Sequence, residues 1–418
     1  MTVTLEALGV RSQTDEAALI VPARELLAML KKVRVPGRVP SPLMALTALS
    51  FQESGWLAVE TFDYQTGLCA ARGKADDSPV QQRLILGEFV IPVLTEITRG
   101  AAKDLEVTLR WTWDSAENLS RLSLESDGFE ISVPSARASQ GHDEFFDVFL
   151  KGTNPHPGAQ QRHLTIDVQA FRDTLDQVMH SASKDDTLPI LTSIALDFST
   201  DKVTAYATDR YRLARSWFPT RCDFDGQFLI KLTEWKRIRT LLDKPGDMKL
   251  TLSGPVGAKS LDHLMMRSES FSASTLCVSG EYPKIKPLFR PEGEQHLIFS
   301  ATEMMRAARI VQTVLERNIP LILTSTEDRS SLQITGSGED GSARSPLIRA
   351  EGDLELRTGF NPTFYREALG AIRGDKIRIS VHAPGKGVRL TSGVEPLDQV
   401  TLEQVVMPVR LPKPEPKL

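Results

Sequence analysis

A long internal repeat constrains the fold of this chain more than any other feature. The string Ile190-Leu191-Thr192-Ser193 returns as Ile322-Leu323-Thr324-Ser325, and each copy follows a proline and an amphipathic helical pattern. Residues 231–236 align with residues 361–366 at the start of a second helical pattern, and a weaker third copy lies between Pro42 and Trp111. This spacing is far longer than the roughly 20–50 residues of solenoid repeats. The sequence therefore predicts one domain copied three times, and such pseudo-symmetry suggests a ring with a partner chain.

Length and composition agree with three globular domains. The chain has 418 residues, and a domain commonly holds roughly 150 residues. Hydrophobic residues make up 41% and charged residues 25%, a balance that provides an ample core. No apolar run approaches the roughly 18 residues of a membrane span, and the N-terminus lacks the basic-then-apolar order of a signal peptide. The three cysteines are scattered, so we expect a cytoplasmic location and no membrane partner.

Turn-rich segments set the expected domain boundaries. We expect an N-terminal extension over residues 1–17 and domains over residues 18–157, 158–293 and 294–418, the last with a Pro/Lys tail. Each domain should belong to the α+β class, with a pair of helices packed on antiparallel sheets.

Local signals predict the helices and one hairpin of these domains. Alternating apolar residues over 194–207 predict a hairpin. Ser300 and Glu303 form a capping-box signature, and Asn361 with Pro362 forms an N-cap and N1 pair. The six expected helical stretches are residues 23–34, 84–99, 168–184, 232–244, 301–317 and 363–373.

Three of the six helices are net basic although the chain carries a net charge of −4. They are residues 23–34, 232–244 and 301–317. The last helix is slightly basic, the third is balanced and the second is slightly acidic. Solvated helix faces would explain any single case. A shared bias on equivalent helices favours a common surface that attracts phosphate without reading bases.

Catalytic and metal-binding motifs are missing from the sequence. The seven histidines form no HExxH motif and do not cluster with cysteine. Residues 254–260 resemble a phosphate-binding loop, but Ala258 stands where the second glycine must precede the lysine, so a hairpin turn is favoured. The acidic pairs at 143–144 and 185–186 would point to opposite sides of an extended chain and are expected at the surface. We expect no metal, no cofactor and no enzymatic activity.

Several motifs, in order along the chain, resemble a known family. The segment 208–214 (TDRYRLA), after 188–192 (LPILT), is similar to the second domain of the bacterial sliding clamp, the β subunit of DNA polymerase III. Further similar motifs lie at residues 280–288, 316–318, 360–362 and 405–411. The resemblance is close over residues 160–411, with an actinobacterial character, and looser in the first domain. The N-terminal extension and the loop around 136–160 depart from the family pattern.

The resemblance implies a ring around duplex DNA. Two chains would close head to tail as a homodimer, with sheets outside and paired helices inside, and contact DNA without sequence specificity. A clamp loader would open the ring, and DNA polymerase III and other clamp-binding proteins would ride on it. Arg38 matches a DNA-facing position of the family. Helix charge alone adds the other DNA-facing candidates: Lys31, Lys32, Lys236, Arg237, Arg239 and Arg306.

The resemblance also implies a pocket between the second and third domains for a short apolar-plus-Gln motif of the partners. The apolar members suit a greasy cleft, and Thr208 can fix a polar side chain. Ordinary core packing is the alternative, above all for Leu191 and Leu213. The matching residues are Leu191, Thr208, Arg210, Tyr211, Arg212, Leu213, Pro283, Leu288, Val405, Val406, Met407, Pro408, Val409, Arg410 and Leu411.

The sequence predicts a dimer interface, because it holds more apolar residues than the edge of a single domain requires. An unpaired strand edge is a liability unless it is covered. We expect a third-domain helix to meet a first-domain strand of the other subunit. The helix carries Ile310, Val311, Val314 and Leu315, and the strand carries Phe129 and Ile131.

The favoured function is a DNA sliding clamp. The alternative is a clamp paralogue with altered ring or partner function, such as a second clamp resistant to a clamp-binding antibiotic, which the drifted first domain suggests. An enzyme acting on DNA has no support in the sequence.

Overall fold

The chain forms two compact units, and each is built mainly from antiparallel sheet. The computed structural model describes residues 16–35, 47–51, 56–73, 82–86, 89–114, 119–134, 158–257, 260–289, 295–316, 319–339, 341–381, 386–393 and 401–411. The first unit comprises Met1–Gln169 and Thr233–Cys277, and the second comprises Ala170–Leu232 and Val278–Leu418. Within the described ranges, no helix is long and apolar enough to cross a membrane.

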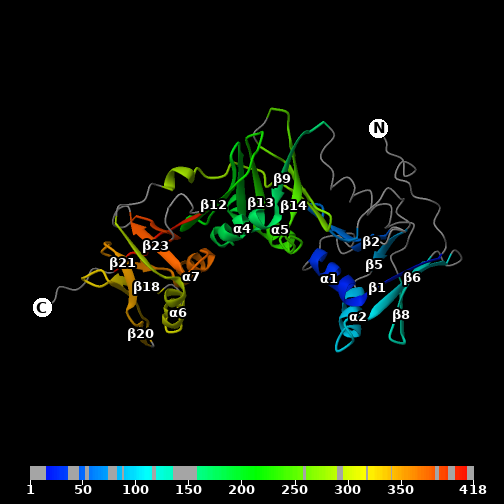
Figure 1. Cartoon of the computed structure of the whole chain (residues 1–418), viewed down its shortest axis with the longest axis horizontal. Coiled ribbons are helices and arrows are strands. Elements are labelled where there is room, and N and C mark those ends of the chain that lie inside the picture. The colour runs from blue at the N-terminus through cyan, green and yellow to red at the C-terminus, as the bar shows by residue number, and fades with distance from the viewer. Residues whose placement is uncertain are drawn as a thin grey trace. The chain divides into compact units, whose positions relative to one another are not determined.

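The order of helices and strands repeats three times along the chain (Figure 1). Each repeat has one strand, a helix, a group of strands, a second helix and three further strands. The first repeat is β1 (Glu16–Pro22), α1 (Ala23–Val33), β2 (Thr47–Phe51), β3 (Leu57–Phe62), β4 (Thr66–Arg72), β5 (Gln82–Leu86), α2 (Val90–Ile97), β6 (Glu106–Asp114), β7 (Leu119–Ser126) and β8 (Phe129–Pro134). The second is β9 (Gln160–Asp167), α4 (Val168–Val178), β10 (Ser193–Ser199), β11 (Lys202–Thr208), β12 (Arg212–Pro219), β13 (Gly226–Lys231), α5 (Leu232–Ile238), β14 (Asp247–Gly254), β15 (His263–Arg267) and β16 (Phe271–Leu276).

The third repeat has one additional short strand between its two helices. It comprises β17 (His296–Ser300), α6 (Ala301–Gln312), β18 (Leu321–Ser325), β19 (Ser331–Ser337), β20 (Ser342–Arg344), β21 (Ile348–Gly352), β22 (Arg357–Phe360), α7 (Pro362–Ala371), β23 (Lys376–Val381), β24 (Val388–Ser392) and β25 (Leu402–Val406). Among the described residues, short turns of 3₁₀ helix lie at Met179–Ser181, Pro189–Thr192 and Lys286–Leu288.

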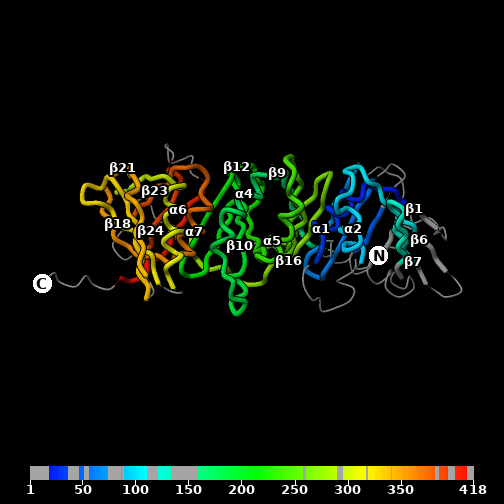
Figure 2. The backbone as a smooth tube through the Cα atoms, turned by 90° about the horizontal axis from the view of Figure 1, so that it is seen from below, coloured from blue at the N-terminus to red at the C-terminus, as the bar shows by residue number. Residues whose placement is uncertain are grey.

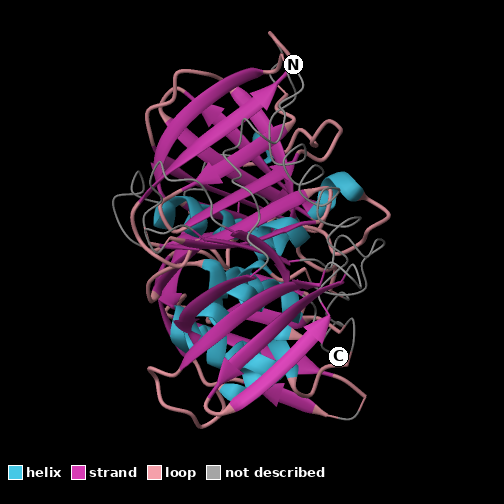
Figure 3. Cartoon of the chain, turned by 90° about the vertical axis from the view of Figure 1, so that its right-hand side faces the viewer, coloured by secondary structure: helices cyan, strands magenta, loops and turns pink. Residues whose placement is uncertain are grey.

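The described strands form three antiparallel sheets, and strands appear in magenta in Figure 3. The first unit holds a four-stranded sheet, in the order β1-β6-β7-β8, and an eight-stranded sheet, in the order β5-β2-β3-β4-β16-β15-β14-β9. The second unit holds a thirteen-stranded sheet, in the order β13-β10-β11-β12-β25-β24-β23-β17-β21-β19-β18-β22, with β20 beside β19. Two of these sheets are continuous from one repeat into the next, through the antiparallel pairs β4–β16 and β12–β25. The two compact units therefore do not coincide with the three repeats.

Helix pairs cover the sheets within each unit (Figure 2). Helix α1 packs against α2, β3 and β4, and α6 packs against α7, β18 and β19. In α1 the buried residues include Leu26, Leu30 and Val33, which are spaced by four and three positions. This is the spacing that brings side chains to one helix face. Met304, Ala308 and Val311 form the corresponding stripe of α6.

The predicted caps are confirmed. The hydroxyl of Ser300 accepts a hydrogen bond from the backbone N–H of Glu303, so α6 begins at the capping signature. The side-chain oxygen of Asn361 accepts from the N–H groups of Thr363 and Phe364 at the start of α7. The predicted hairpin over 194–207 is also confirmed as the antiparallel pair β10–β11.

Four predicted helices are wrong in extent. The helix predicted over 168–184 ends at Val178, before a 3₁₀ turn at Met179–Ser181, and the helix predicted over 301–317 ends at Gln312. Residues 82–86 form β5, paired with β2, so the helix predicted over 84–99 begins only at Val90. A short apolar run such as Leu84-Ile85-Leu86 does not distinguish a strand from a helix by its spacing. The helix predicted over 232–244 ends at Ile238. The hydroxyl of Thr240 bonds the carbonyl of Arg237 there, and such local bonds compete with continuation of a helix.

The repeated string that revealed the triplication is not structurally equivalent in its two copies. Residues 190–192 lie in a 3₁₀ turn before β10, whereas residues 322–325 lie inside β18. Strand pairing gives the true alignment, because Ser193 faces Lys231 and Leu321 faces Phe360. The alignment of residues 231–236 with 361–366 is confirmed, since both segments enter the second helix of their repeat.

Candidate partner-binding site

A tight turn between β11 and β12 forms the centre of the candidate site. The carboxylate of Asp209 accepts hydrogen bonds from the backbone N–H groups of Tyr211 and Arg212, each at 3.0 Å. The hydroxyl of Thr208 accepts from the N–H of Arg210 at 3.2 Å and donates to the carbonyl of Arg212 at 2.8 Å. Asp and Thr favour such turns because their side chains bond nearby backbone groups. The turn is thereby fixed, and it leaves Arg210 and Tyr211 exposed.

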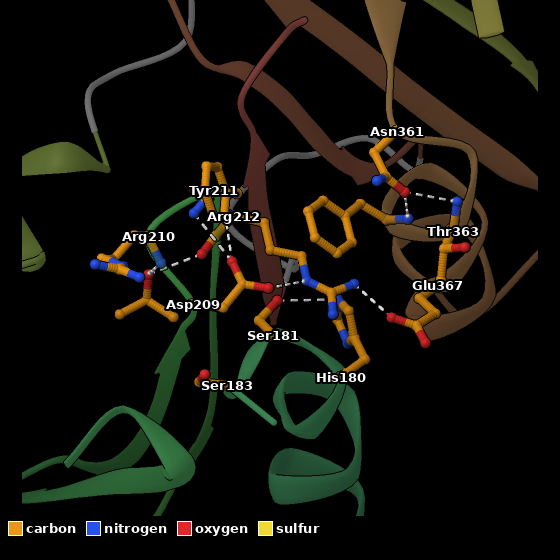
Figure 4. A network of polar contacts seen from close by, with 12 residues as sticks. His180, Ser181, Ser183, Asp209, Arg210, Tyr211, Arg212, Asn361, Thr363 and Glu367 are labelled. Atoms are coloured by element: carbon orange, nitrogen blue, oxygen red, sulfur yellow. Dashed lines mark hydrogen bonds and ion pairs between the residues drawn. The ribbon is translucent and has the colours of Figure 1, made fainter. Parts of the chain in front are cut away.

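Arg212 links this turn to helix α7 through a buried guanidinium group, whose side chain is only 3% exposed. Its Nε donates to Asp209 at 2.9 Å and its Nη1 donates to Glu367 at 2.5 Å (Figure 4). The guanidinium carbon lies 4.3 Å from the centre of the Phe364 ring. A buried charge must be paired, and Arg212 is paired within the chain. Arg212 therefore supports the site from inside and presents no free charge to a partner.

The pKa values of two groups beside Arg212 are shifted. Burial raises the pKa of Glu367, but the hydrogen bond and positive charge of Arg212 outweigh burial and lower the pKa below its usual value. Lys184 adds a second cation, 3.6 Å from Glu367. Burial, and then the charge of Arg212, lowers the pKa of His180 to about 4. At neutral pH the network therefore contains a charged carboxylate and a neutral imidazole.

The C-terminal segment continues from β25 past this turn towards β22. The backbone N–H of Met407 donates to the carbonyl of Tyr211 at 2.8 Å, and the N–H of Val409 donates to the carbonyl of Gly359 at 2.8 Å. A Cβ atom at Gly359 would lie 2.7 Å from Cδ2 of Leu411, so a larger residue at this position would require the Leu411 side chain to move. The side chains of Met407 and Val409 remain 41% and 38% exposed. The segment is therefore anchored by its backbone while it presents apolar side chains.

An aromatic pair completes the surface. The rings of Tyr211 and Phe364 are stacked, with centroids 6.3 Å apart and planes at 28°. Phe364 lies in the first turn of α7, where the Asn361 cap fixes the backbone. This cap was predicted from the sequence, but Phe364 was not identified there as part of the site. The missed signal was its position three residues after the cap, which places it on a defined face of the helix.

The predicted pocket residues divide into exposed, half-buried and buried groups. The exposed ones are Arg210, Tyr211, Pro283, Leu288, Met407, Val409 and Arg410, and the half-buried ones are Pro408 and Leu411. The buried ones are Leu191, Thr208, Arg212, Leu213, Val405 and Val406. Arg212 and Val406, at 3% and 1% exposure, belong to the supporting core instead of the contact surface. Pro283 follows Tyr282, whose hydroxyl accepts the N–H of Thr208 at 3.1 Å.

The DNA-facing candidates differ in how free their charges are. Lys31, Lys236 and Arg306 are exposed, and Arg239 is half-buried. Lys32 forms an ion pair with Asp243 at 2.6 Å. Arg38 lies outside the described residues.

The prediction from helix charge that Arg237 faces DNA is corrected by its ion pairs. The Arg237 side chain is 11% exposed and pairs with Asp63 and, at 2.8 Å, with Glu234. Its charge is therefore neutralised within the first unit.

The predicted interface residues also differ in exposure. Phe129 on β8 and Ile310 on α6 are 62% and 55% exposed, and Ile131 is half-buried. Val314 and Leu315 follow the end of α6 and are half-buried.

Val311 is a core residue, which corrects its assignment to the interface. It is 1% exposed. A Cβ atom at Gly336 of β19 would lie 2.8 Å from both Val311 Cγ1 and Leu315 Cδ2. These two side chains thus pack on the sheet of their own repeat.

Comparison with known proteins agrees with this geometry. Residues 165–284 match the model of the DNA polymerase III beta subunit, central domain. The chain is 29% identical to the beta sliding clamp of Micrococcus luteus over 73% of this chain and 90% of that protein. It is 27% identical to the beta sliding clamp homolog GriR of Streptomyces muensis over 59% of this chain and 67% of that protein. The crystal structure of the C. crescentus beta sliding clamp has a TM-score of 0.75, with 18% identity, and covers 96% of this chain and 100% of that one.

The protein thus has the sliding-clamp fold, with antiparallel sheets and short helices. Within that class, the chain is similar in sequence to bacterial beta sliding clamps and, over residues 165–284, to the central domain of the DNA polymerase III beta subunit.

Proposed function

We propose that this chain is a DNA sliding clamp, a non-catalytic subunit that encircles duplex DNA and tethers DNA polymerase III and other clamp-binding proteins. Its three repeats act as the predicted domains 18–157, 158–293 and 294–418, the first extended to Glu16 by β1, and two chains close head to tail. A clamp loader opens the ring. The exposed cations Lys31, Lys236 and Arg306 contact phosphates, and such contacts permit sliding because they carry no base information.

The observation that carries this proposal is the way in which one repeat joins the next. The strand after the hairpin of one repeat pairs with the last strand of the following repeat, as in β4–β16 and β12–β25. By the same rule, β20 of the third repeat and β8 of the first each lack a partner. Among the described strands, β8 has only β7 as a neighbour and β20 has only β19. Pairing of β20 with β8 of a second chain would repeat the junction and close the ring.

Strand register predicts which residues meet at that junction. Arg215 of β12 faces Tyr206 of the preceding strand, and Arg344 of β20 faces Thr335 in the equivalent pair. Arg344 therefore corresponds to Arg215. In the junction within the chain, Arg215 faces Glu403 and forms an ion pair with it at 2.5 Å.

Glu130 of β8 corresponds to Glu403. Ile131 of β8 pairs with β7 in the same register as Ala273 of β16 pairs with β15. The preceding residues, Glu130 and Ser272, are therefore equivalent. Ser272 is in turn the β16 counterpart of Glu403 on β25. We therefore expect Arg344 of one chain to face Glu130 of the other. Both side chains are exposed in the single chain, so changing them should leave its folding intact.

Charge reversal at these positions tests the ring. Light scattering at micromolar concentration should give twice the chain mass for the unmodified protein. Arg344→Glu or Glu130→Arg alone should weaken the dimer by about tenfold or more, because like charges then face each other. The double variant should restore it. A monomer in the unmodified protein would refute the ring, whereas single reversals without effect would refute the register.

The surface around Tyr211, Phe364 and Met407 is the proposed partner site. Its exposed aromatic and thioether side chains suit an apolar peptide anchor. The alternative of a specialised paralogue is not favoured, since identity to GriR, at 27%, is no higher than the 29% to the Micrococcus luteus clamp.

A further inference from the structure

Arg210 adopts a backbone conformation that disfavours an arginine. Its φ angle is 79°, in the left-handed region. This region costs free energy for a residue with a Cβ atom and is the usual place of glycine. Asp209 and Thr208 hold the turn through the hydrogen bonds described above, so the strain is imposed by the turn. Residues strained in this way cluster at functional sites, which makes Arg210 a candidate for a role in binding.

The chain itself makes little use of the Arg210 side chain. Among the described residues, no hydrogen bond or ion pair engages its guanidinium, and the side chain is exposed. The nearby carboxylate of Asp185 is held by Thr187, whose hydroxyl donates at 2.6 Å and whose N–H donates at 3.0 Å. Hydrogen bonds from Thr187 are the first cause of the lowered pKa of Asp185, and attraction to Arg210 comes last.

In the equivalent turn of the first repeat, the residue at the same strained position packs its side chain against the chain itself. There Asp63 accepts from the N–H groups of Gln65 and Thr66, at 3.1 and 2.8 Å, and Tyr64 has a φ of 68°. The backbone N–H of Leu276 donates to the carbonyl of Gln65, just as Met407 bonds Tyr211. The Tyr64 ring, however, packs on Phe62 with centroids 5.8 Å apart. The same strained position thus has an internal partner in one repeat and a solvent-facing cation in the other.

We propose that Arg210 is a specificity-determining residue that binds a carboxylate of the docked partner segment. The inference rests on the proposed partner site, because Arg210 precedes Tyr211 in the turn that carries it. A guanidinium matches a carboxylate in a two-point geometry that a lysine cannot reproduce. The carboxylate belongs either to an acidic side chain next to the apolar anchor or to the C-terminus of the segment.

Peptide binding to the full-length protein tests this inference. The probe is a fluorescein-labelled peptide with an apolar-plus-Gln motif, two acidic residues after it and a free C-terminus. Arg210→Gly removes the guanidinium and accepts the positive φ without strain. It should weaken binding by roughly 5- to 20-fold and flatten the salt dependence. Arg210→Lys should retain most of the salt dependence.

Arg329→Gly is the matched control, because Arg329 also has a positive φ, 60°, in the turn between β18 and β19. The same substitution there should leave peptide affinity unchanged. An amidated peptide and a peptide with the acidic residues changed to amides identify the source of the carboxylate. The effect of Arg210→Gly should vanish with one of them.

The outcomes separate this inference from the proposed site. If the peptide does not bind the unmodified protein, or binds independently of Met407, the partner site itself is wrong. Binding that depends on Met407 but changes less than twofold in Arg210→Gly would overturn the role of Arg210 alone. A loss that persists after all peptide carboxylates are neutralised would also overturn it.

Discussion

The Arg212 network predicts a measurable loss of stability when Glu367 is neutralised. Glu367→Gln keeps the shape of the side chain but removes the charge that pairs with Arg212 Nη1 at 2.5 Å. Removing one partner of a fully buried ion pair costs roughly 3–5 kcal/mol. Here the Glu367 side chain is 32% exposed, and Arg212 retains Asp209 and the Phe364 face. We therefore expect a reduced cost of about 1–2 kcal/mol.

Urea unfolding followed by circular dichroism measures this loss. Lys184→Met is the matched control, because Lys184 also pairs with Glu367 but at 3.6 Å and with 71% exposure. Removal of so exposed a partner should cost no more than about 0.5 kcal/mol. A cost below about 0.5 kcal/mol for Glu367→Gln, or an equal loss of stability in both variants, would contradict this role of the Arg212–Glu367 ion pair.

Two further predictions concern pH and partner binding. His180 has a folded pKa of about 4 and an unfolded pKa near 6.5, so the unfolded chain binds more protons between these values. Stability should fall as pH drops through this window, by at most about 3 kcal/mol. His180→Gln should flatten the slope in pH-dependent melting, while the exposed His163→Gln should leave it; an unchanged slope in His180→Gln would contradict the assignment. Changing Met407 and Leu411 together to Ala should weaken a polymerase tail peptide by roughly thirty- to a thousand-fold, equivalent to about 2–4 kcal/mol. Fluorescence anisotropy measures this loss, with dimer mass as the control, and a change below about threefold would place the partner elsewhere.

Features set by local chemistry could be predicted from the sequence. The Ser300 and Asn361 caps and the β10–β11 hairpin depend on nearby residues, and all three are found. The threefold order of elements was also predictable. Strand pairing shows, however, that the two copies of the string that suggested it occupy different positions in their repeats.

Features set by tertiary contacts could not be predicted in this way. Helix charge marked Arg237 as a phosphate contact, but Asp63, far away in sequence, neutralises it. An apolar stripe marked Val311 as interface, but the sheet of its own repeat covers it. Phe364 was missed because its role depends on Tyr211 and Arg212 from another repeat. Sequence patterns indicate which side chains can interact, whereas the long-range partner decides their use.

Retention on circular DNA tests the central claim most directly. The protein, loaded by a purified clamp loader with ATP onto a nicked circular plasmid, should stay bound through a wash in about 1 M salt, where phosphate contacts are screened. Cutting the plasmid at one site should release it, because a ring held only by topology slides off a free end. Retention that survives linearisation, or tight sequence-selective binding to a short linear duplex, would contradict the sliding-clamp function.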